Sequence, residues 1–378
     1  MALPQIVLLT LGSAHAAEVT RFPPALRGDV EIRYDVGGEK GRLLEDGTEV
    51  GTRRLTHHHI TYTGTFSPVT GVALYVGLPH LASERVRFFD AQSMAYDPRL
   101  ENGTMVGTDT LADAEAERGT GMGGVWIGLK GAPMHRELYP RRSDRVSWVL
   151  DAGFRFRDKT NFWTYGPRER RGAGPGAPAF RFQGSVSSKH RWAEPYLVAT
   201  LLRTGRITTD VVDADGQVVA QGLDLRPASR VDSVVGVEYT LHEYGQGAMV
   251  ALDMHGSFGY ATWQDIPSGL YLPSVLDASS QLPATMSENT RLGVGGGVNW
   301  RFIEYLQLNV TGDVGINTGG RVEHYYPVSM GMGALEWGVH TTLQFKVRDL
   351  LWEGAATTES GRADRPPKPP PENPPPAY

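Results

Sequence analysis

The sequence contains no cysteine, which excludes disulfide-stapled scaffolds, thiolate metal sites and a cysteine nucleophile. Neither sign of charge is in clear excess, because 37 Lys and Arg stand against 42 Asp and Glu in 378 residues, a formal net charge of −5. The basic surface of a nucleic-acid-binding protein is therefore not expected. Apolar runs are short as well, and none approaches the roughly 18–20 residues of a transmembrane helix.

The N-terminus carries the pattern of an export signal. Residues 6–11 form a short apolar core, and Ala14-His15-Ala16 matches the A-x-A pattern that a signal peptidase cuts, here before Ala17. The segment before the core lacks Lys and Arg, which is atypical, and a short buried strand is the alternative. We predict that residues 1–16 are a signal peptide. An exported chain without cysteine fits a Gram-negative envelope.

Apolar and polar residues alternate along most of this chain, which is rich in glycine and aromatic residues. Over 335–340, for example, apolar Leu, Trp and Val alternate with Glu, Gly and His. This period of two is typical of β-strands with two unlike faces. Segments of this kind lie at 53–65, 71–78, 85–95, 121–130, 145–156, 179–188, 193–203, 231–242, 248–260, 291–302, 304–316 and 333–347.

The length and the ends of these segments favour a bilayer-spanning barrel. Most are longer than the roughly 5–6 residues of soluble strands and match the roughly 9–11 residues of a tilted membrane-spanning strand. Their polar faces carry full charges, which the interior of a soluble β-sandwich would exclude. Trp300, Tyr260 and Trp263 lie near segment ends, where aromatic residues of barrels meet lipid headgroups.

Connector lengths support the same architecture. Outer-membrane barrels alternate short periplasmic turns with long outer loops. Here the connectors 189–192, 244–247 and 303–304 are short, whereas 157–178 and 204–230 are long. The long connectors 96–120, 261–290 and 317–332 follow the scheme, and 131–144 departs from it because it should be short.

The number of strands must be even if both termini are periplasmic. The segments from residue 53 onward give twelve strands, with fourteen as the alternative. Residues 29–36 also alternate, but they would make the number odd, so either they lie outside the wall or a further strand near 322–328 brings the number to fourteen. We therefore assign residues 17–52 to an N-terminal segment that is periplasmic or associated with the lumen, and residues 53–348 to the barrel.

In strand pattern, turn lengths and export signal, residues 53–348 resemble the class of bacterial outer-membrane β-barrel proteins. This resemblance implies an all-β, antiparallel up-and-down barrel. Members of the class serve as porins, specific channels, transporters of hydrophobic compounds, enzymes and parts of envelope machines. One departure is that such barrels commonly end on an aromatic residue, whereas here Phe345 lies inside the last strand and residues 349–378 follow.

Residues 349–378 form a Pro-rich C-terminal tail. The run Arg365–Pro376 is dominated by proline and is expected to be extended, polyproline-like and exposed. Two interpretations stay open: a tail that docks periplasmic protein partners, or a disordered end without a role.

Three short motifs suggest cofactors or metals and are better explained as barrel structure. Gly119–Gly124 satisfies G-x-G-x-x-G, but a strand pattern follows it where a dinucleotide site needs a helix. On a strand, His57 and His59 share a face while His58 points away, which predicts polar strand surface rather than a metal site. Asp213–Gly216 lacks the glycine of a calcium loop, since Val218 stands there, and predicts a hairpin over 206–225.

Hydrolase signatures of the G-x-S-x-G and H-E-x-x-H types are absent from the sequence. Four polar residues share the luminal face of neighbouring strands and could form a hydrogen-bonded network: His255, Asp253, His242 and Glu238. The alternative is a lumen lined by mixed charges, which the wider set of luminal residues favours: Arg155, Arg157, Arg291, Arg301, Asp151, Asp313 and Glu336. No catalytic, cofactor-binding or metal-binding residue is predicted.

The sequence thus predicts a protein of the Gram-negative outer membrane that contacts outer-membrane lipid and binds no cofactor. Its expected role is a channel or transporter, or the outer-membrane component of an envelope-spanning machine for motility or polymer export. A barrel enzyme of hydrolase type and a soluble exported β-sandwich are the alternatives.

Overall fold

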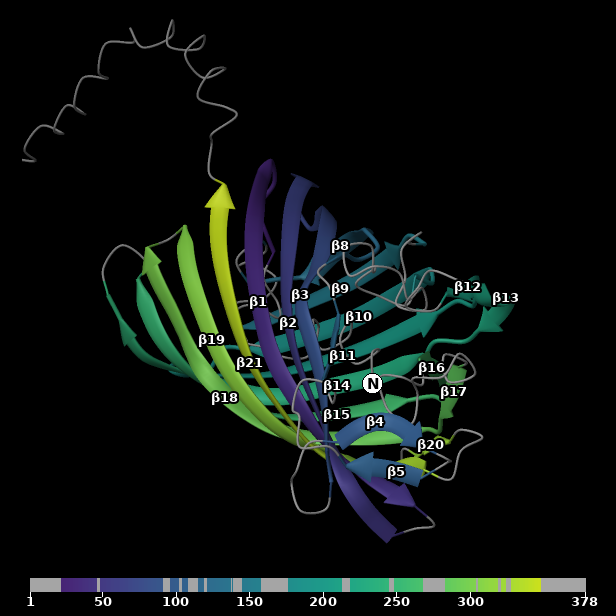
Figure 1. Ribbon diagram of the computed structural model, residues 1–378. Coiled ribbons are helices and arrows are strands. Elements are labelled where there is room, and N and C mark those ends of the chain that lie inside the picture. Colours follow the sequence, from purple (N-terminus) through teal and green to yellow (C-terminus); the bar gives the residue numbers. More distant parts are fainter. Residues whose placement is uncertain are drawn as a thin grey trace, which may run out of the picture.

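The computed structural model describes residues 22–45, 48–90, 96–101, 104–107, 115–118, 121–136, 138, 145–157, 176–212, 218–244, 248–267, 283–303, 305–318, 321–323 and 328–347 (Figure 1). The predicted signal peptide at 1–16 and the Pro-rich tail at 349–378 lie outside these ranges. Within them, every regular element is a β-strand. No helix among the described residues is long and apolar enough to cross a membrane.

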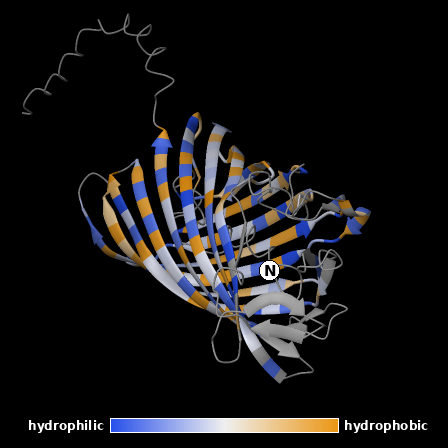
Figure 2. Cartoon of the chain, in the orientation of Figure 1, coloured by the Kyte–Doolittle hydropathy of each residue, from blue (hydrophilic) through white to orange (hydrophobic). Residues whose placement is uncertain are grey.

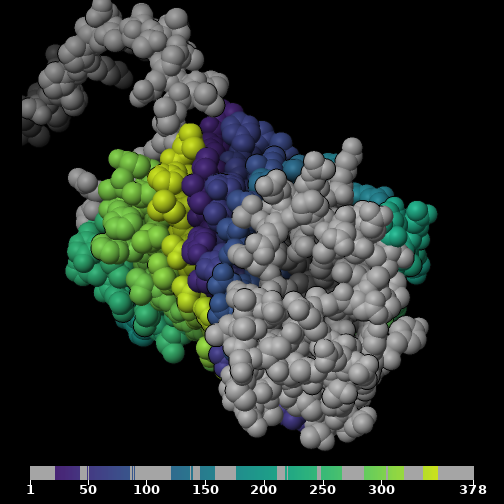
Figure 3. All heavy atoms as spheres, viewed as in Figure 1, coloured from purple at the N-terminus to yellow at the C-terminus, as the bar shows by residue number. Residues whose placement is uncertain are grey.

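Twelve antiparallel strands form a closed barrel, as the sequence predicts. Each strand pairs with the next along the wall, and the last strand pairs back to the first through partners such as Val347 and Gly28. Figure 3 shows this seam, where the yellow strand lies beside the purple one. The wall strands are β1 (Arg27–Glu45), β2 (Thr48–Val69), β3 (Val72–Asp90), β8 (Trp126–Met134), β9 (Val146–Arg155), β10 (Ala179–Ser188), β11 (Ala193–Thr204), β14 (Arg230–Glu243), β15 (Met249–Ala261), β18 (Asn289–Ile303), β19 (Leu306–Thr318) and β21 (Val328–Val347).

Shorter strands occupy the long connectors. β12 and β13 form a separate two-stranded sheet, which confirms the hairpin predicted at 206–225. β6 and β7 pair with β3 and so extend the wall. The bounds of these elements are β4 (Tyr96–Glu101), β5 (Thr104–Gly107), β6 (Glu115–Arg118), β7 (Gly121–Met122), β12 (Ile207–Val212), β13 (Val218–Leu225), β16 (Gln264–Pro267), β17 (Pro283–Met286) and β20 (Arg321–Glu323).

The two ends of the barrel differ in their connectors. At one end β1 begins, β21 ends, and β2–β3, β10–β11, β14–β15 and β18–β19 are joined by short turns. We call this the short-turn end, and the opposite end the long-loop end. Two connectors break the scheme: β8–β9 is long at the short-turn end, as the sequence already indicates, and β1–β2 is tight at the long-loop end.

Two strand assignments from the sequence are wrong, and their errors cancel in the number of strands. Residues 29–36 belong to β1, which pairs with β2 and β21 in the wall, so the barrel begins at Arg27 rather than at residue 53. The segments 71–78 and 85–95 are largely one strand, β3. A β-bulge in the pairing of β2 with β3 leaves Ala82 without a partner, and the bulge shifts the inward phase from odd to even residues. Tyr75 and Leu81, which precede the bulge, are buried, and so is Glu84, which follows it. The alternation is therefore interrupted, and the sequence pattern predicts two strands.

The two faces of the wall are opposite in character. Large apolar side chains such as Val30, Leu74 and Trp337 are exposed on the outer face, whereas the inner face buries charged and polar groups such as Asp253 and His340. Figure 2 shows the resulting alternation of hydrophobic and hydrophilic bands along the strands. A soluble β-sandwich would bury its apolar face between two sheets. The closed ring with apolar residues outside contradicts that alternative.

The place of β1 in the wall leads to a stability prediction. Ile32 lies on the outer face, 36% exposed, between Val30 and Tyr34. Replacing it with Arg would place a charge against lipid and is expected to destabilise the barrel by about 2–4 kcal/mol. Urea unfolding in phospholipid vesicles, followed by tryptophan fluorescence, measures the change.

The neighbouring substitution Glu31→Gln on the inner face of the same strand provides the control, with a much smaller expected effect. An Ile32→Arg variant as stable as the wild type would place β1 outside the lipid-facing wall.

Candidate luminal site

At the seam of the barrel, where β21 pairs with β1, a histidine side chain lies between two carboxylates. His340 on β21 is 1% exposed. Its Nδ1 lies 2.6 Å from Asp35 Oδ1 on β1, and its Nε2 lies 2.7 Å from Asp313 Oδ1 on β19. Arg33 Nε donates to the same oxygen of Asp35 at 2.8 Å. Because both ring nitrogens face carboxylate oxygens, the doubly protonated ring satisfies both sides with one side chain.

Ion pairs continue from this seam along β18, β19 and β21. Arg291 Nη2 donates to Asp313 Oδ2 at 3.1 Å, and Arg291 Nε lies 2.7 Å from Glu336 Oε2. Asn317 Nδ2 donates to Glu336 Oε1 at 3.1 Å. Arg291, Asp313 and Glu336, predicted as luminal charges of mixed sign, are therefore paired across strands.

The predicted group of His255, Asp253, His242 and Glu238 is only partly assembled. Tyr196 donates to Asp253 Oδ1 at 2.7 Å, and His255 Nδ1 lies 2.6 Å from Asp253 Oδ2. Glu238 instead accepts from Asn299 Nδ2 at 3.2 Å. His242 is exposed near the short-turn end, where the centroid of its ring lies 4.2 Å from the centroid of the Tyr244 ring.

Among the described residues, no hydroxyl nucleophile is bonded to His255 in the Asp253–His255 pair. The Nε2 atom of His255 packs against the backbone of Gly295, where a Cβ would lie 2.5 Å away. In the described part of the chain, no hydroxyl group forms a hydrogen bond with this nitrogen. In the described part of the barrel, His255 is thus held on the wall by Asp253 on one side and Gly295 on the other.

A stack of cations and aromatic rings lines another part of the lumen, on β3, β8, β9 and β10. We call it the cation–ring stack. Lys130 Nζ and the Arg181 guanidinium each lie over the Tyr75 ring, 5.5 Å from its centroid. The guanidinium groups of Arg181 and Arg155 each lie over the Trp126 ring, 5.4 Å from its centroid. Such contacts are attractive because the ring face is electronegative.

One carboxylate, Asp151, lies within this stack. Tyr75 donates its hydroxyl to Asp151 Oδ1 at 2.9 Å, and Arg181 donates to the Tyr75 hydroxyl at 2.8 Å. Arg181 is also paired with Asp151 Oδ2 at 3.3 Å. Arg155 donates to the backbone carbonyl of Ala177. Among the described residues, Lys130 and Arg181 thus share this part of the wall with the carboxylate of Asp151, an excess of one positive charge.

Glycines allow the luminal rings to lie flat on the wall. A Cβ at Gly128 or Gly153 would collide with the Tyr75 side chain, and one at Gly236 would lie 2.5 Å from the Tyr196 ring. Each tyrosine crosses the glycines to reach an aspartate beyond the adjacent strand. The tyrosine–aspartate contacts therefore join next-nearest strands and run along the wall, whereas the bond from Arg181 on β10 reaches Tyr75 three strands along, on β3.

An apolar cluster and an ion pair occupy the lumen near the short-turn end. Phe22, which precedes β1, packs with Ala73, Ala132 and Val149 in a buried cluster. Beside it, Glu194 Oε1 accepts from Arg136 at 2.6 Å and from Ser187 at 2.7 Å. Sequence reasoning missed this cluster because Phe22 lies outside the alternating pattern and Ala132 follows an irregular pairing of β8 with β9.

The remaining candidate residues are distributed over the wall. His57 and His59 share the inner face, with ring centroids 5.4 Å apart, and His58 lies 2.6 Å from the Tyr34 hydroxyl on the other face, as the alternation predicts. No group of three or more metal-ligating side chains is arranged for a metal among the described residues.

Gly121 and Met122 form β7, and β8 follows at Trp126, so the glycine motif is followed by a strand. Arg157 donates to Thr208 O of the β12–β13 hairpin and lies outside the luminal pairs.

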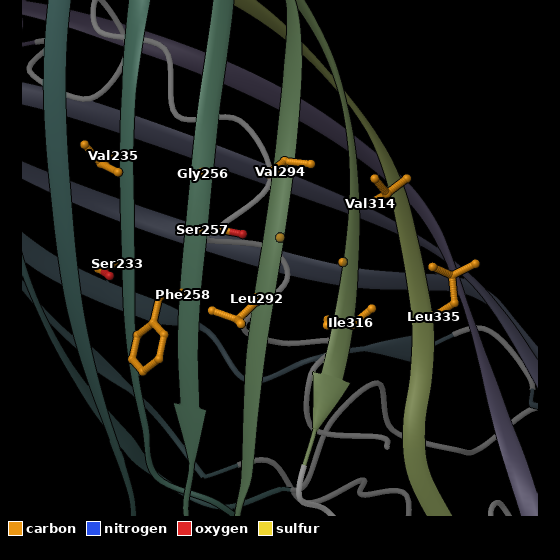
Figure 4. Close-up of a pocket in the computed structure, with 12 residues that line it drawn as sticks. Ser233, Val235, Gly256, Ser257, Phe258, Leu292, Val294, Val314, Ile316 and Leu335 are labelled. Atoms are coloured by element: carbon orange, nitrogen blue, oxygen red, sulfur yellow. The ribbon is translucent and has the colours of Figure 1, made fainter.

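The outer face has a shallow apolar groove of about 590 Å³ over β14, β15, β18, β19 and β21. Figure 4 shows Val235, Val294 and Val314 beside it, and Gly256, which has no side chain, lies between the first two. A Cβ at Gly256 would meet no atom closer than 3.8 Å. Outward Gly256 therefore leaves a hollow in the apolar face, whereas the luminal glycines described above are covered by rings.

No protein-family model matches the sequence, and no curated protein matches it either. Solved structures give matches at low identity. An outer membrane channel from Pseudomonas putida F1 is 10% identical, with a TM-score of 0.45, over 89% of this chain and 100% of that chain. The toluene transporter TodX of P. putida is 9% identical, with a TM-score of 0.39, over 89% and 93%. The transport unit of the autotransporter AIDA-I from Escherichia coli is 10% identical, with a TM-score of 0.44, over 91% and 96%. At such identities the likeness concerns the barrel fold alone.

The seam contacts predict a large effect of removing His340. The substitution His340→Ala leaves Asp35 and Asp313, both nearly inaccessible, without the partner that they share. Breaking a buried ionic contact by removing one partner costs about 3–5 kcal/mol. The expected result is a fall of that size in the free energy of unfolding, measured by urea titration in vesicles.

The matched control is His58→Ala on β2, because His58 faces outward and contacts Tyr34 instead. Equal losses in the free energy of unfolding would show that the seam contact stabilises the barrel no more than the outward contact of His58 does.

Proposed function

We propose that this protein is an integral β-barrel of the outer membrane that acts as a channel for small hydrophilic solutes. One observation carries the proposal: the strands close into a ring whose outer face is apolar and whose inner face is charged. The proposal has two parts, the membrane location and the passage.

The membrane location is supported by the exposed apolar face. A closed barrel satisfies every strand edge, which lets a sheet cross lipid without unpaired backbone groups. Exposed Phe154, Phe180 and Trp300 near strand ends are typical of the aromatic girdles at the headgroup level. Because periplasmic turns are short in outer-membrane barrels, we assign the short-turn end to the periplasm and the long-loop end to the outside.

The passage is supported by how the luminal side chains are arranged. Tyr75, Tyr196 and His255 lie along the wall over glycines, so their bonds to Asp151 and Asp253 do not cross the lumen. Charged and polar groups on the inner face favour water and ions over apolar solutes. The cation–ring stack adds a positive region, which favours anions among the solutes that pass.

The experiment combines cell fractionation with planar-bilayer recording. The protein is expected in the outer-membrane fraction, with heat-modifiable migration on gels, and the purified barrel is expected to give ion conductance. A water-soluble periplasmic pool would contradict the location. Membrane localisation without conductance, together with co-purifying periplasmic proteins, would contradict the channel and support a component of an envelope machine.

The cation–ring stack predicts ion selectivity. Replacing Lys130 and Arg181 with Gln removes two positive charges from the lumen while retaining side chains of similar length. We expect the chloride-to-potassium permeability ratio, taken from reversal potentials in a salt gradient, to fall on the order of twofold or more. The outward variant Tyr62→Phe serves as the control and should keep the wild-type ratio. An unchanged permeability ratio in the double variant would show that the cation–ring stack does not lie on the path of the ions.

A further inference from the structure

The cation–ring stack leaves charged and aromatic surface open to the lumen. Other inward charges on the wall, such as Asp253 and His340, are at most 1% exposed. In the stack, the Arg181 side chain is 18% exposed, and Lys130 and Trp126 are half-buried. A solute in the lumen can therefore contact these three side chains directly.

The position of Tyr75 directs the two cations of the stack towards the lumen. Its ring lies on Gly128 and Gly153, where an added Cβ would collide with the side chain, so the wall occupies one face of the ring. Lys130 and Arg181 lie over the same ring, and Tyr75 itself is only 5% exposed. The two positive groups therefore lie between the ring and the lumen.

Strand register places the cations beside Trp126. Lys130 and Asp151 share one inward row across β8, β9 and β10, Arg181 lies in the next row, and Trp126 lies in the row after that. Successive inward rows are roughly 7 Å apart, because a strand advances about 3.3 Å per residue. A molecule with one aromatic ring can therefore reach from the cations to the indole.

The charge balance of the stack indicates which anion fits it. Among the described residues, Lys130 Nζ lies over the Tyr75 ring and has no ion-pair partner. Arg181 is paired with Asp151, so the two cations exceed the carboxylate by one charge. A monovalent anion neutralises this excess, whereas a divalent anion would leave a negative charge in a confined space.

A filled apolar layer lies next to the stack on its short-turn side. Phe22 packs there against Ala73, Ala132 and Val149, and each of these three residues lies two positions along its strand from a member of the stack. All four are at most 4% exposed. A solute that moves along this wall from the long-loop end therefore meets the cations just before a closed layer, which favours its retention at the stack.

We propose that the cation–ring stack binds an aromatic monocarboxylate, with the carboxylate at Lys130 and Arg181 and the aromatic ring against Trp126. The inference deepens the proposed function and rests on it, because the solute must reach the lumen. Lysine and arginine bind carboxylates through charge-assisted hydrogen bonds. Aromatic rings attract one another in offset or edge-to-face arrangements. The stack thus supplies a partner for each half of the molecule.

Binding is measured with benzoate and without reference to conductance. The full-length protein, folded in nonionic detergent at pH 7, is titrated with sodium benzoate. Saturation-transfer-difference NMR follows the bound ligand, with empty micelles as the blank. Saturable binding is expected, with a dissociation constant on the order of 1 mM. Benzamide has the same ring but no charge and is expected to bind about tenfold more weakly.

Charge variants test the carboxylate contact. Lys130→Gln and Arg181→Gln should each weaken benzoate binding about tenfold and leave benzamide binding at the wild-type level. Lys189→Gln is the matched control, because Lys189 is exposed at the short-turn end, where it pairs with Glu243. Asp151→Asn removes the negative charge of the stack and should tighten benzoate binding about threefold. A misfolded barrel could not produce that gain.

Trp126→Leu tests the ring contact, because leucine keeps an apolar side chain without an aromatic face. Wild type is expected to bind benzoate about threefold more tightly than cyclohexanecarboxylate, whereas the variant should bind the two equally. Heat-modifiable migration on gels confirms that each variant is folded.

Absence of saturable benzoate binding to the folded wild type would overturn the proposal. Benzamide binding as tight as that of benzoate, or a loss in Lys189→Gln as large as in Lys130→Gln, would overturn it too. Displacement of benzoate by a lower concentration of inorganic phosphate would show a general anion site instead. A barrel that conducts ions without binding benzoate would contradict this site alone, whereas benzoate binding without conductance would support the site and contradict the channel.

Discussion

The pairing of β21 with β1 is the constraint on which the rest of the structure depends. A sheet that leaves an edge open exposes a row of unpaired N–H and C=O groups, which lipid cannot satisfy. Here the pairing runs from Val347 and Gly28 at one end to Val328 and Glu45 at the other. The backbone seam is reinforced in the lumen by His340, which contacts carboxylates on the strands at either side of its own. The first and last strands are therefore joined by both backbone and side chains.

Closure also determines how polar groups are satisfied inside the barrel. Every second residue of a strand must face the lumen, and these positions hold carboxylates and cations at high density. Long side chains there find partners on neighbouring strands when an intervening residue is small. Gly128 and Gly236 create such paths for Tyr75 and Tyr196, and the tyrosine hydroxyls meet Asp151 and Asp253. These two tyrosine rings are thus held against the wall by contacts along it.

The sequence was sufficient to predict the class of fold, since alternation is a property of single strands and needs no knowledge of their neighbours. It failed where structure depends on pairing. The bulge at Ala82 reverses the phase within β3, and the alternating residues 29–36 are ambiguous until β2 and β21 are seen beside them. For the lumen, the sequence predicted charged residues of both signs but not which of them contact each other. Strand register determines that Arg291 pairs with Asp313 and that His242 lies at the short-turn end. One sequence does not specify that register.

Glycine has opposite consequences on the two faces of this wall. On the inner face, the space left by Gly236 or Gly295 is occupied by a ring from an adjacent strand, because the curvature of the barrel brings inward side chains together. On the outer face, the same curvature spreads side chains apart, and the space at Gly64 and Gly256 stays open. Exposing such apolar hollows to water costs free energy, whereas hydrocarbon chains can fill them. Gly236 and Gly295 therefore shape the inner face to its own side chains, whereas Gly64 and Gly256 leave hollows on the apolar outer face.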